Sequence, residues 1–280
     1  MGATLTPSLN SIVRSILAED VGRGDITTEI TTSPSARGRA RILARGAGMI
    51  AGLPVARACF EEMEQGPVGW ACLEEGARAD TGDVVVTIEA RVRSILTAER
   101  TALNLLSRLS GVATATAEIV ELVKEHPVRI TDTRKTTPGL RLLEKYAVRV
   151  GGGFNHRFGL DDGILIKDNH ASAAGGVAEA VRRAKKKAPH SLRIEVEVGN
   201  LAELDEALAT GADAILLDNM TVDQVREAVN TAGGKALLEV SGGVTRDNVA
   251  DYASTGVDVI SMGAITHSAR HIDLSLEVDT

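Results

Sequence analysis

The sequence predicts an α/β protein: an incomplete, open α/β barrel of about seven strands, preceded by an N-terminal α+β sandwich domain. The main observation is a plan repeated in six segments from about residue 128 to residue 265. In each, a short apolar run of the kind seen in buried strands ends in a charged or glycine-bearing group, and a polar or helical stretch follows. A further short strand is expected at 147–150. The six segments are RITDTRKT (129–136), GILIKDNH (163–170), RIEVEVGN (193–200), DAILLDNM (213–220), LLEVSGGV (237–244) and VISMGAITH (259–267).

Residues 1–110 lack this alternation and mix short helical and strand patterns. Ser8 to Leu17 has apolar residues at helical spacing, and strands are expected at 39–44 and 83–90 because β-forming residues gather there. Thr97 to about Glu125 is a strongly helical stretch, in which Ser110-Gly111 predicts a break between two helices.

These patterns predict two domains. We place the α+β domain at 1–110 and the barrel at 111–269, and we expect the tail 270–280 to return to the first domain. Asn200 with Glu203 and Thr221 with Gln224 resemble capping boxes, which mark helix starts within the barrel.

Composition excludes several classes of partner. The 280 residues carry a formal net charge of −7, which argues against nucleic acid or an anionic membrane, because no excess of cations exists to neutralise phosphates. No apolar run approaches the roughly 18 residues that span a bilayer, and no secretory signal pattern precedes Ser8. Cys59 and Cys72 are too few for a disulfide framework, so we expect free thiols in a reducing cytoplasm.

Active sites of α/β barrels lie at the carboxyl ends of the strands, and here those ends are mainly cationic. Arg134 and Lys135 follow the first strand beside Thr133, and offer a planar fork and a mobile charge for carboxylate or phosphate. The next loop, with three glycines from Gly151 onward, adds the donors His156 and Arg157.

Lys167 emerges after the next apolar run, where it can bind phosphate, form a Schiff base or simply pair with Asp168. Glu195 and Glu197 alternate along one strand and therefore share a face, with Glu197 nearer the mouth. Glu197 and Asp218, on adjacent strand ends, can bind ribose hydroxyls, a Mg²⁺ ion or both.

The last two strands end in small residues that suit an anion. Glycine turns expose backbone N–H groups, and the loops after the final strands are the usual phosphate site of such barrels. The expected phosphate residues are Ser241, Gly242, Gly243, Gly263 and His267. A cationic mouth with two carboxylates and a glycine cradle predicts a small polyanionic substrate.

Taken together, the motifs resemble the quinolinate phosphoribosyltransferase family. The matching stretches run in order along nearly the whole chain, from EDVGRGDITT (19–28) through AERTALNLLSRLSG (98–111), TDTRKTTPGLR (131–141), GGGFNHRFGLDDGILIKDNH (151–170), EVEVGNLAEL (195–204), AILLDNM (214–220), EVSGGVT (239–245) and SMGAITHS (261–268). The resemblance implies transfer of phosphoribose from phosphoribosyl pyrophosphate to quinolinate with decarboxylation, giving nicotinate mononucleotide, pyrophosphate and CO₂ with Mg²⁺. It also implies a homodimer with shared active sites, and leaves dimer versus hexamer open.

The resemblance further implies a role for each residue. Arg134, His156 and Arg157 would hold the quinolinate carboxylates, joined by Arg100 from the other subunit. Lys135 and Lys167 would serve phosphoribosyl pyrophosphate and the departing pyrophosphate, and Glu197 and Asp218 the ribose and metal.

Three alternatives stay open at this point. A related enzyme can use nicotinate or another nitrogen acceptor, although two arginines and a histidine suit a dicarboxylate better. An aldolase acting through a Lys167 Schiff base is more distant. A catalytically silent binding protein of the molybdate-operon type would share the fold, but Arg134, Lys135 and Lys167 are all present.

Overall fold

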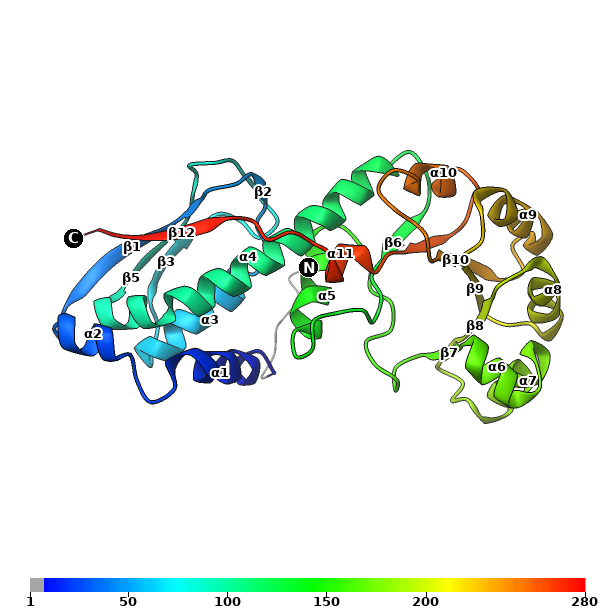
Figure 1. Ribbon diagram of the computed structural model, residues 1–280, viewed down its shortest axis with the longest axis horizontal. Coiled ribbons are helices and arrows are strands. Elements are labelled where there is room, and N and C mark those ends of the chain that lie inside the picture. The colour runs from blue at the N-terminus through cyan, green and yellow to red at the C-terminus, as the bar shows by residue number, and fades with distance from the viewer. Residues whose placement is uncertain (1–7, 280) are drawn as a thin grey trace. The chain divides into compact units, whose positions relative to one another are not determined.

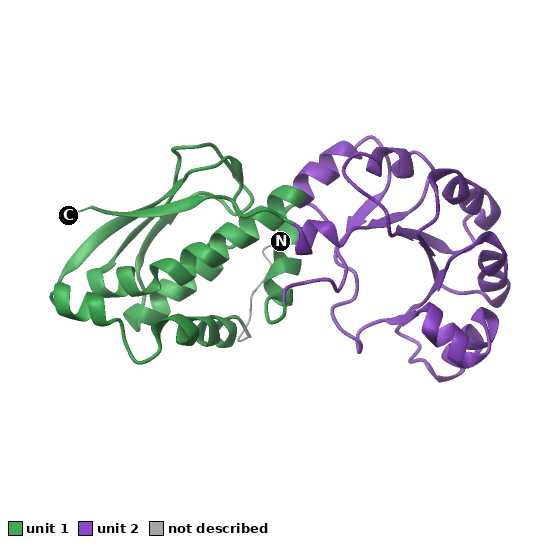
Figure 2. Cartoon of the chain, viewed as in Figure 1, with its two compact units in different colours: residues 1–115, 138–151, 269–280 green, residues 116–137, 152–268 purple. Residues whose placement is uncertain are grey.

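The computed structural model describes residues 8–279, which form two compact units (Figure 2). Unit 1 contains the residues up to 115, residues 138–151 and those from 269 onward, and unit 2 contains residues 116–137 and 152–268. This division differs from the expected one, because 138–151 was placed in the barrel domain. Over the described range, no helix combines the length and apolar character needed to cross a membrane.

Unit 1 is built on an antiparallel four-stranded sheet in the order β12-β1-β5-β3 (Figure 1). Every second residue of β1, from Ala40 to Ala44, is fully buried, which is the alternation expected of a sheet with one face in the core. The C-terminal strand β12 pairs with β1 from Arg39↔Asp279 to Ala44↔Leu274, so the chain end is part of this sheet. Its elements are α1 (Ser8–Val21), α2 (Ile26–Thr31), β1 (Arg37–Ala44), β2 (Gly48–Met49), α3 (Leu53–Glu64), β3 (Gly69–Cys72), β4 (Arg78–Ala79), β5 (Val84–Arg91), most of α4 (Val92–Leu122), α5 (Arg141–Val150) and β12 (Leu274–Asp279).

Helix α4 is continuous through Ser110 and Gly111, so the predicted break there was wrong. Gly111 has a packing role instead, because a Cβ at this position would lie 2.1 Å from the carbonyl oxygen of Arg270. The glycine permits the C-terminal segment to cross the helix closely, and the helix interior tolerates it.

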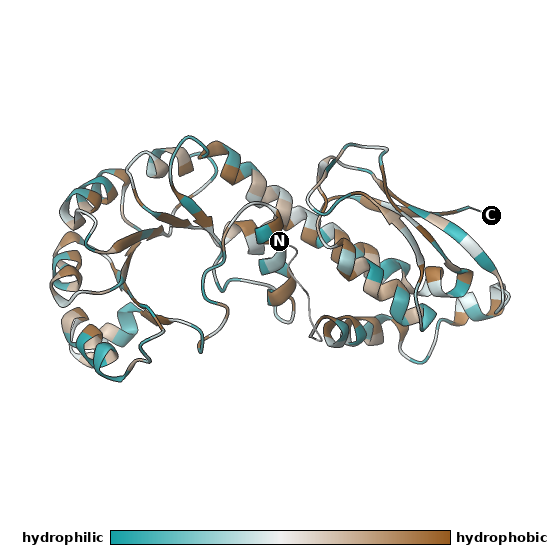
Figure 3. Ribbon diagram, turned by 180° about the vertical axis from the view of Figure 1, so that it is seen from behind, coloured by the Kyte–Doolittle hydropathy of each residue, from teal (hydrophilic) through white to brown (hydrophobic). Residues whose placement is uncertain are grey.

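Unit 2 is a parallel sheet in the order β6-β11-β10-β9-β8-β7, with α8 and α9 on its outer side (Figure 1). The strands are apolar, as expected for a sheet covered by helices (Figure 3). Since β6 and β7 are not paired, the barrel is open, as predicted. Its elements are β6 (Arg129–Thr131), β7 (Ile164–Ile166), α6 (Asp168–Ala174), α7 (Val177–Lys187), β8 (Ile194–Val198), α8 (Leu201–Thr210), β9 (Ala214–Asp218), α9 (Val222–Ala232), β10 (Leu237–Ser241), α10 (Val249–Ala253), β11 (Val259–Ser261) and α11 (Ala264–His267).

The strand expected at 147–150 is wrong, because these residues complete helix α5. Leu143, Tyr146 and Ala147 are all buried, at the three- and four-residue spacing of a helix face. Six strands therefore make the sheet. Beyond β6, only Phe154 adds a single parallel bridge to Thr131 within the described chain.

Candidate functional site

The carboxyl ends of the six parallel strands bring most of the expected site residues to one edge of the unit 2 sheet, which we call the polar edge. Each residue lies in the last two positions of a strand or in the segment that follows it, which for His267 is the short helix α11. The polar edge comprises Thr133, Arg134 and Lys135 after β6, Lys167 after β7, Glu197 on β8, Asp218 on β9, Ser241, Gly242 and Gly243 at and after β10, and Gly263 and His267 after β11.

Lys167 and Glu197 form the clearest pair at this edge. The Nζ atom of Lys167 donates to Oε2 of Glu197 at 2.9 Å, so Lys167 pairs across strands with Glu197, whereas a pair with its neighbour Asp168 was one sequence alternative. Glu197 is largely buried, with 13% of its side chain exposed, while Lys167 is 48% exposed. The largely buried Glu197 carboxylate therefore holds the Lys167 ammonium group at the mouth of the barrel.

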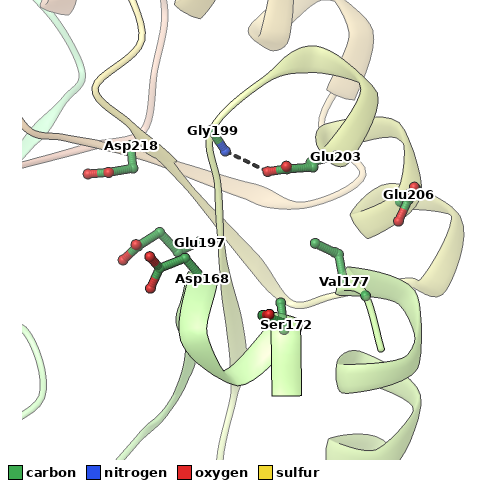
Figure 4. A pocket seen from close by; sticks show the side chains of 10 residues that line it. Asp168, Ser172, Val177, Glu197, Gly199, Glu203, Glu206 and Asp218 are labelled. Atoms are coloured by element: carbon green, nitrogen blue, oxygen red, sulfur yellow. Dashed lines mark hydrogen bonds between the residues drawn. The ribbon is translucent and has the colours of Figure 1, made fainter. Parts of the chain in front are cut away.

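Beside this pair lies a pocket of about 480 Å³ that is rich in carboxylates (Figure 4). The side chains of Asp168, Glu197 and Asp218 point to the same side of the pocket, whereas Glu206 lies apart from them (Figure 4). Glu203 accepts the backbone N–H of Gly199 at 2.8 Å and so closes the loop that starts α8. Carboxylate oxygens are the ligands that Mg²⁺ prefers, although these three do not form a group with ligand atoms within 4.8 Å of one another among the described residues.

The strand that bears Asp218 lies next to the glycine turn. Asp218 is directly opposite Ser241 in the parallel register, and Gly242 and Gly243 follow with φ of +81° and +65°. These left-handed conformations favour glycine and leave backbone N–H groups of the turn accessible. Asn248 donates to the carbonyl oxygen of Gly243 at 3.0 Å and fixes the far side of the turn.

Lys135 lies against the loop after β11. The hydroxyl of Thr266 donates to the Lys135 carbonyl oxygen at 2.8 Å, and a Cβ on Gly263 would lie 3.0 Å from Cδ of Lys135. The same Cβ would lie 3.1 Å from the His267 ring. Gly263 thus lets Lys135, from the loop after β6, and His267, at the end of α11, approach the same point of the edge.

His156 is directed into the interior of the sheet. Its Nε2 lies 3.1 Å from Oε2 of Glu195 and 3.7 Å from Oε1 of Glu239. The backbone N–H of Arg157 donates to Nδ1 at 2.8 Å, so Nε2 carries the ring proton and donates to Glu195. We call His156, Glu195 and Glu239 the inner cluster.

Burial governs the charges of the inner cluster. Burial, and then the nearby Glu195 carboxylate, raise the pKa of Glu239 to about 7, so this acid is largely protonated below neutral pH. Burial, and then the positive charge of Arg134, lower the pKa of Arg157 from its usual value. Oε1 of Glu239 and Nε of Arg157 are buried without a hydrogen-bond partner, which is uncommon for buried polar atoms.

The inner cluster is also the one group of three close His, Cys, Asp or Glu ligands found among residues 8–279. Its donor set does not suit a metal in this state, because the proton on Nε2 of His156 occupies the lone pair that a metal would need. A cavity of about 420 Å³ adjoins the cluster and extends past the starts of the strands, with Arg129 and Arg193 in its lining.

Sequence reasoning missed two buried acids that shape this region. Asp132 is fully buried. Its carboxylate accepts hydrogen bonds from the backbone N–H of His156 at 3.0 Å and from the side-chain amide of Asn155 at 2.5 Å. Glu239 has the period-two spacing to Ser241 that Glu195 has to Glu197, which is the signal that could have identified it.

Arg100 is in the other unit. It lies on α4 with 65% of its side chain exposed and 3.9 Å from Glu99. The polar edge and the inner cluster belong entirely to unit 2, so Arg100 is the one expected site residue that comes from unit 1.

Comparisons with known proteins give a consistent result. Family models of the quinolinate phosphoribosyl transferase N-terminal and C-terminal domains match residues 25–110 and 112–277. The carboxylating nicotinate-nucleotide pyrophosphorylase of Mycobacterium leprae is 46% identical over 273 residues, which cover 95% of this chain and 95% of that protein. The structure of NadC from Streptococcus pyogenes has a TM-score of 0.95 at 40% identity and covers 99% of both chains. The nicotinate-nucleotide pyrophosphorylase structure from Francisella tularensis has a TM-score of 0.91 at 43% identity, over 97% of this chain and 96% of that one.

Proposed function

Since the chain belongs to the quinolinate phosphoribosyltransferase family, as its motifs predicted, we propose that the polar edge of unit 2 is the site of its reaction. The enzyme transfers phosphoribose to quinolinate with decarboxylation, a step of NAD biosynthesis. The observation that carries the site is the convergence at one sheet edge of two lysines, two acids and a glycine turn. The inner cluster and its arginines complete the proposal on the quinolinate side.

Quinolinate carries two carboxylates, and the region of Arg134 and Arg157 supplies the charge to hold them. The two guanidinium groups are close enough that Arg134 lowers the pKa of Arg157, so an anion bound between them would relieve their repulsion. Since His156 donates Nε2–H to Glu195, we propose that its ring forms the inner wall of the quinolinate site, beside Arg157.

Phosphoribosyl pyrophosphate is assigned to the remainder of the polar edge. Lys135 and Lys167 face the pyrophosphate, with Thr133 beside Lys135, and the turn Gly242–Gly243 receives the 5′-phosphate. Ser241, Gly263 and His267 line the same phosphate site. The short distance between Lys135 and Gly263 supports a continuous anion site across two loops.

Glu197 and Asp218 are assigned to the ribose hydroxyls and Mg²⁺. Their carboxylates and that of Asp168 line one pocket and are of the oxygen-ligand type that Mg²⁺ prefers; the ion, when bound, would offset charge on the pyrophosphate. Lys167 already pairs with Glu197 at 2.9 Å, so substrate must draw this lysine away from its acid. Removal of the metal with a chelator should abolish turnover.

The chemistry follows from where the charges lie. Breaking the bond from ribose C1 to pyrophosphate places positive charge on the sugar and negative charge on the leaving group, where Lys135 and Lys167 stabilise it. The pyridine nitrogen forms the new bond to C1 and becomes a pyridinium. That positive nitrogen stabilises the electron pair left on C2 when CO₂ departs, and a proton taken up at C2 completes nicotinate mononucleotide. Much of the work is to hold two anions in contact, which is positioning.

The decisive experiment mixes the purified chain, Mg²⁺ and phosphoribosyl pyrophosphate with either quinolinate or nicotinate. We expect nicotinate mononucleotide and CO₂ from quinolinate alone. Turnover of nicotinate alone would overturn the dicarboxylate assignment of Arg134 and Arg157. No product from either acceptor would overturn the proposed site as a whole.

We also propose a homodimer in which Arg100 of one subunit completes the active site of the other. Its exposed side chain on α4 supports this assignment. Arg100→Ala and Lys135→Ala subunits, each inactive alone, should recover activity when mixed, because one of the two sites in a mixed dimer is then intact. Sedimentation would distinguish a dimer from a hexamer, and a monomer at working concentration would contradict the shared site.

A cytoplasmic location is the last part of the proposal. Cys59 is buried and Cys72 exposed, and both are free thiols, as a reducing compartment permits. Cell fractionation with antibody detection tests it, and recovery in the membrane or secreted fraction would contradict it.

A further inference from the structure

Asn219, which follows Asp218 at the end of β9, has an unusual backbone for a non-glycine residue. Its φ is +54°, in the left-handed region, and Gln65 is the one other described non-glycine residue with positive φ. Asparagine tolerates this conformation better than most residues, yet a cost remains that neighbouring contacts must offset. The hydrogen bonds of Asn219 described below join it to the polar edge.

The first contact is with the acid beside it. The Asn219 side-chain amide Nδ2 donates to Oδ2 of Asp218 at 2.8 Å. A hydrogen bond to a charged carboxylate is stronger than one between neutral groups. It fixes the rotation of the Asp218 carboxylate and so fixes the direction in which the other oxygen points.

The second contact is with the glycine turn. The Asn219 backbone N–H donates to the Ser241 carbonyl oxygen at 2.9 Å. Its side chain packs so closely on Gly242 that a Cβ there would lie 2.4 Å from Oδ1 of Asn219. The same amide therefore lies against the backbone of the turn while it holds Asp218.

The segment that carries Asn219 is anchored beyond it. The Tyr252 hydroxyl donates to the Met220 carbonyl oxygen at 2.9 Å, and Thr221 caps helix α9. Asn219 cannot follow a displaced Asp218 or Gly242 without breaking these bonds. It thus acts as a fixed spacer between a carboxylate and a turn that come from two different strands.

We propose that Asn219 is a positioning residue that sets the separation between the Asp218 carboxylate and the Gly242–Gly243 turn. The inference rests on the proposed function, in which Asp218 takes the ribose or Mg²⁺ and the turn takes the 5′-phosphate. Ribose and 5′-phosphate are joined by one short linkage in the substrate. A site that fixes the same spacing binds phosphoribosyl pyrophosphate without reorganising.

The test is Asn219→Gly, which keeps the left-handed backbone without strain and removes only the amide. Gln65→Gly is the matched control, because it also replaces a non-glycine residue of positive φ, but one that belongs to unit 1 and not to the polar edge. Calorimetric titration with phosphoribosyl pyrophosphate and Mg²⁺ should show roughly tenfold weaker binding for Asn219→Gly. The Gln65→Gly control should bind with the same affinity as the wild type. Quinolinate binding and the unfolding midpoint should stay unchanged in both.

A second variant tests the contact with the turn. Gly242→Ala should weaken phosphoribosyl pyrophosphate binding strongly in the wild-type background, where its Cβ meets the Asn219 amide. In the Asn219→Gly background, the fold-loss in affinity caused by Gly242→Ala should be less than half as large. Equal effects in both backgrounds, or unchanged phosphoribosyl pyrophosphate binding in Asn219→Gly, would overturn the inference. Failure of the proposed function shows separately, as wild-type protein that turns over neither acceptor.

Discussion

Both units bury charged side chains, and one group from each differs from the other in how completely its polar atoms are hydrogen-bonded. In unit 1, Arg108 donates to Glu144 at 3.0 and 2.8 Å and to the carbonyl oxygen of Ala269 at 2.9 Å. In the inner cluster of unit 2, His156 lies 3.1 Å from Glu195, while Glu239 keeps an oxygen with no hydrogen-bond partner.

In the proposed function, the difference separates charges that hold the chain together from charges that belong to the substrate site. The Arg108 pair links α4, α5 and the C-terminal segment within unit 1, and both side chains are almost entirely buried. The inner cluster instead adjoins a cavity, and burial raises the pKa of its Glu239 carboxyl. Incomplete pairing and shifted pKa values are features of functional sites. Four expected results test this contrast, in order of decreasing size.

Loss of the Arg108 partner should have the largest effect on stability. Glu144→Gln removes the carboxylate charge that accepts two hydrogen bonds from the buried Arg108 guanidinium and should lower the free energy of unfolding by about 3–5 kcal/mol. Urea denaturation measures this, with Glu121→Gln on the exposed part of α4 as control, for which we expect a change below about 1 kcal/mol. The folded fraction should keep its kcat/KM; a large loss of activity would remove the contrast between the units.

Lys167→Ala should give the reverse result. We expect kcat/KM to fall by roughly 10²–10³-fold, because the proposal places this cation beside the leaving pyrophosphate. The free energy of unfolding should change little, since Lys167 is half exposed. Lys186→Ala, an exposed lysine on α7, is the matched control and should leave both quantities unchanged. Unaltered kcat/KM in Lys167→Ala would contradict the assignment of this lysine.

The inner cluster should make stability depend on pH. Because the pKa of Glu239 rises from 4.5 to about 7 on folding, the native state holds a proton that the unfolded state releases between these values. This group therefore stabilises the fold less as pH rises through that window. Glu239→Gln cannot lose the proton, so its stability should gain about 1–3 kcal/mol relative to wild type from pH 4.5 to 7. If the difference in unfolding free energy between wild type and Glu239→Gln does not change with pH, the pKa of Glu239 is not raised on folding.

The smallest effect is expected at the exposed pairs of the unit 1 sheet. Arg45 pairs with Glu277 at 2.6 Å across β1 and β12, with side chains 42% and 46% exposed. Solvent and salt screen such pairs, so Arg45→Ala should lower the unfolding free energy by less than about 1 kcal/mol and leave activity unchanged. A loss of unfolding free energy as large as that of Glu144→Gln would show that solvent exposure does not distinguish the Arg45–Glu277 pair from the buried Arg108–Glu144 pair.

Some features of this protein were determined by local sequence. The apolar runs with a polar or glycine end predicted the parallel strands and placed Lys167, Glu197 and Asp218 at one edge, because parallel strands end on the same side. The caps at Asn200 and Thr221 were also predictable, since a helix start depends on a few neighbouring residues. The family followed from motifs that carry these same residues.

Other features were decided only by contacts between distant residues. Residues 147–150 are helical because one face of α5 is buried. Gly111 lies within a continuous helix, where its lack of a Cβ makes room for the backbone of Arg270. The pairing of Lys167 with Glu197 and the packing of Asn219 on Gly242 join residues from different strands. The sequence names the residues at each strand end, but distance, burial and hydrogen bonding arise when the strands assemble. Those quantities set the pKa of Glu239 and the proton position on His156.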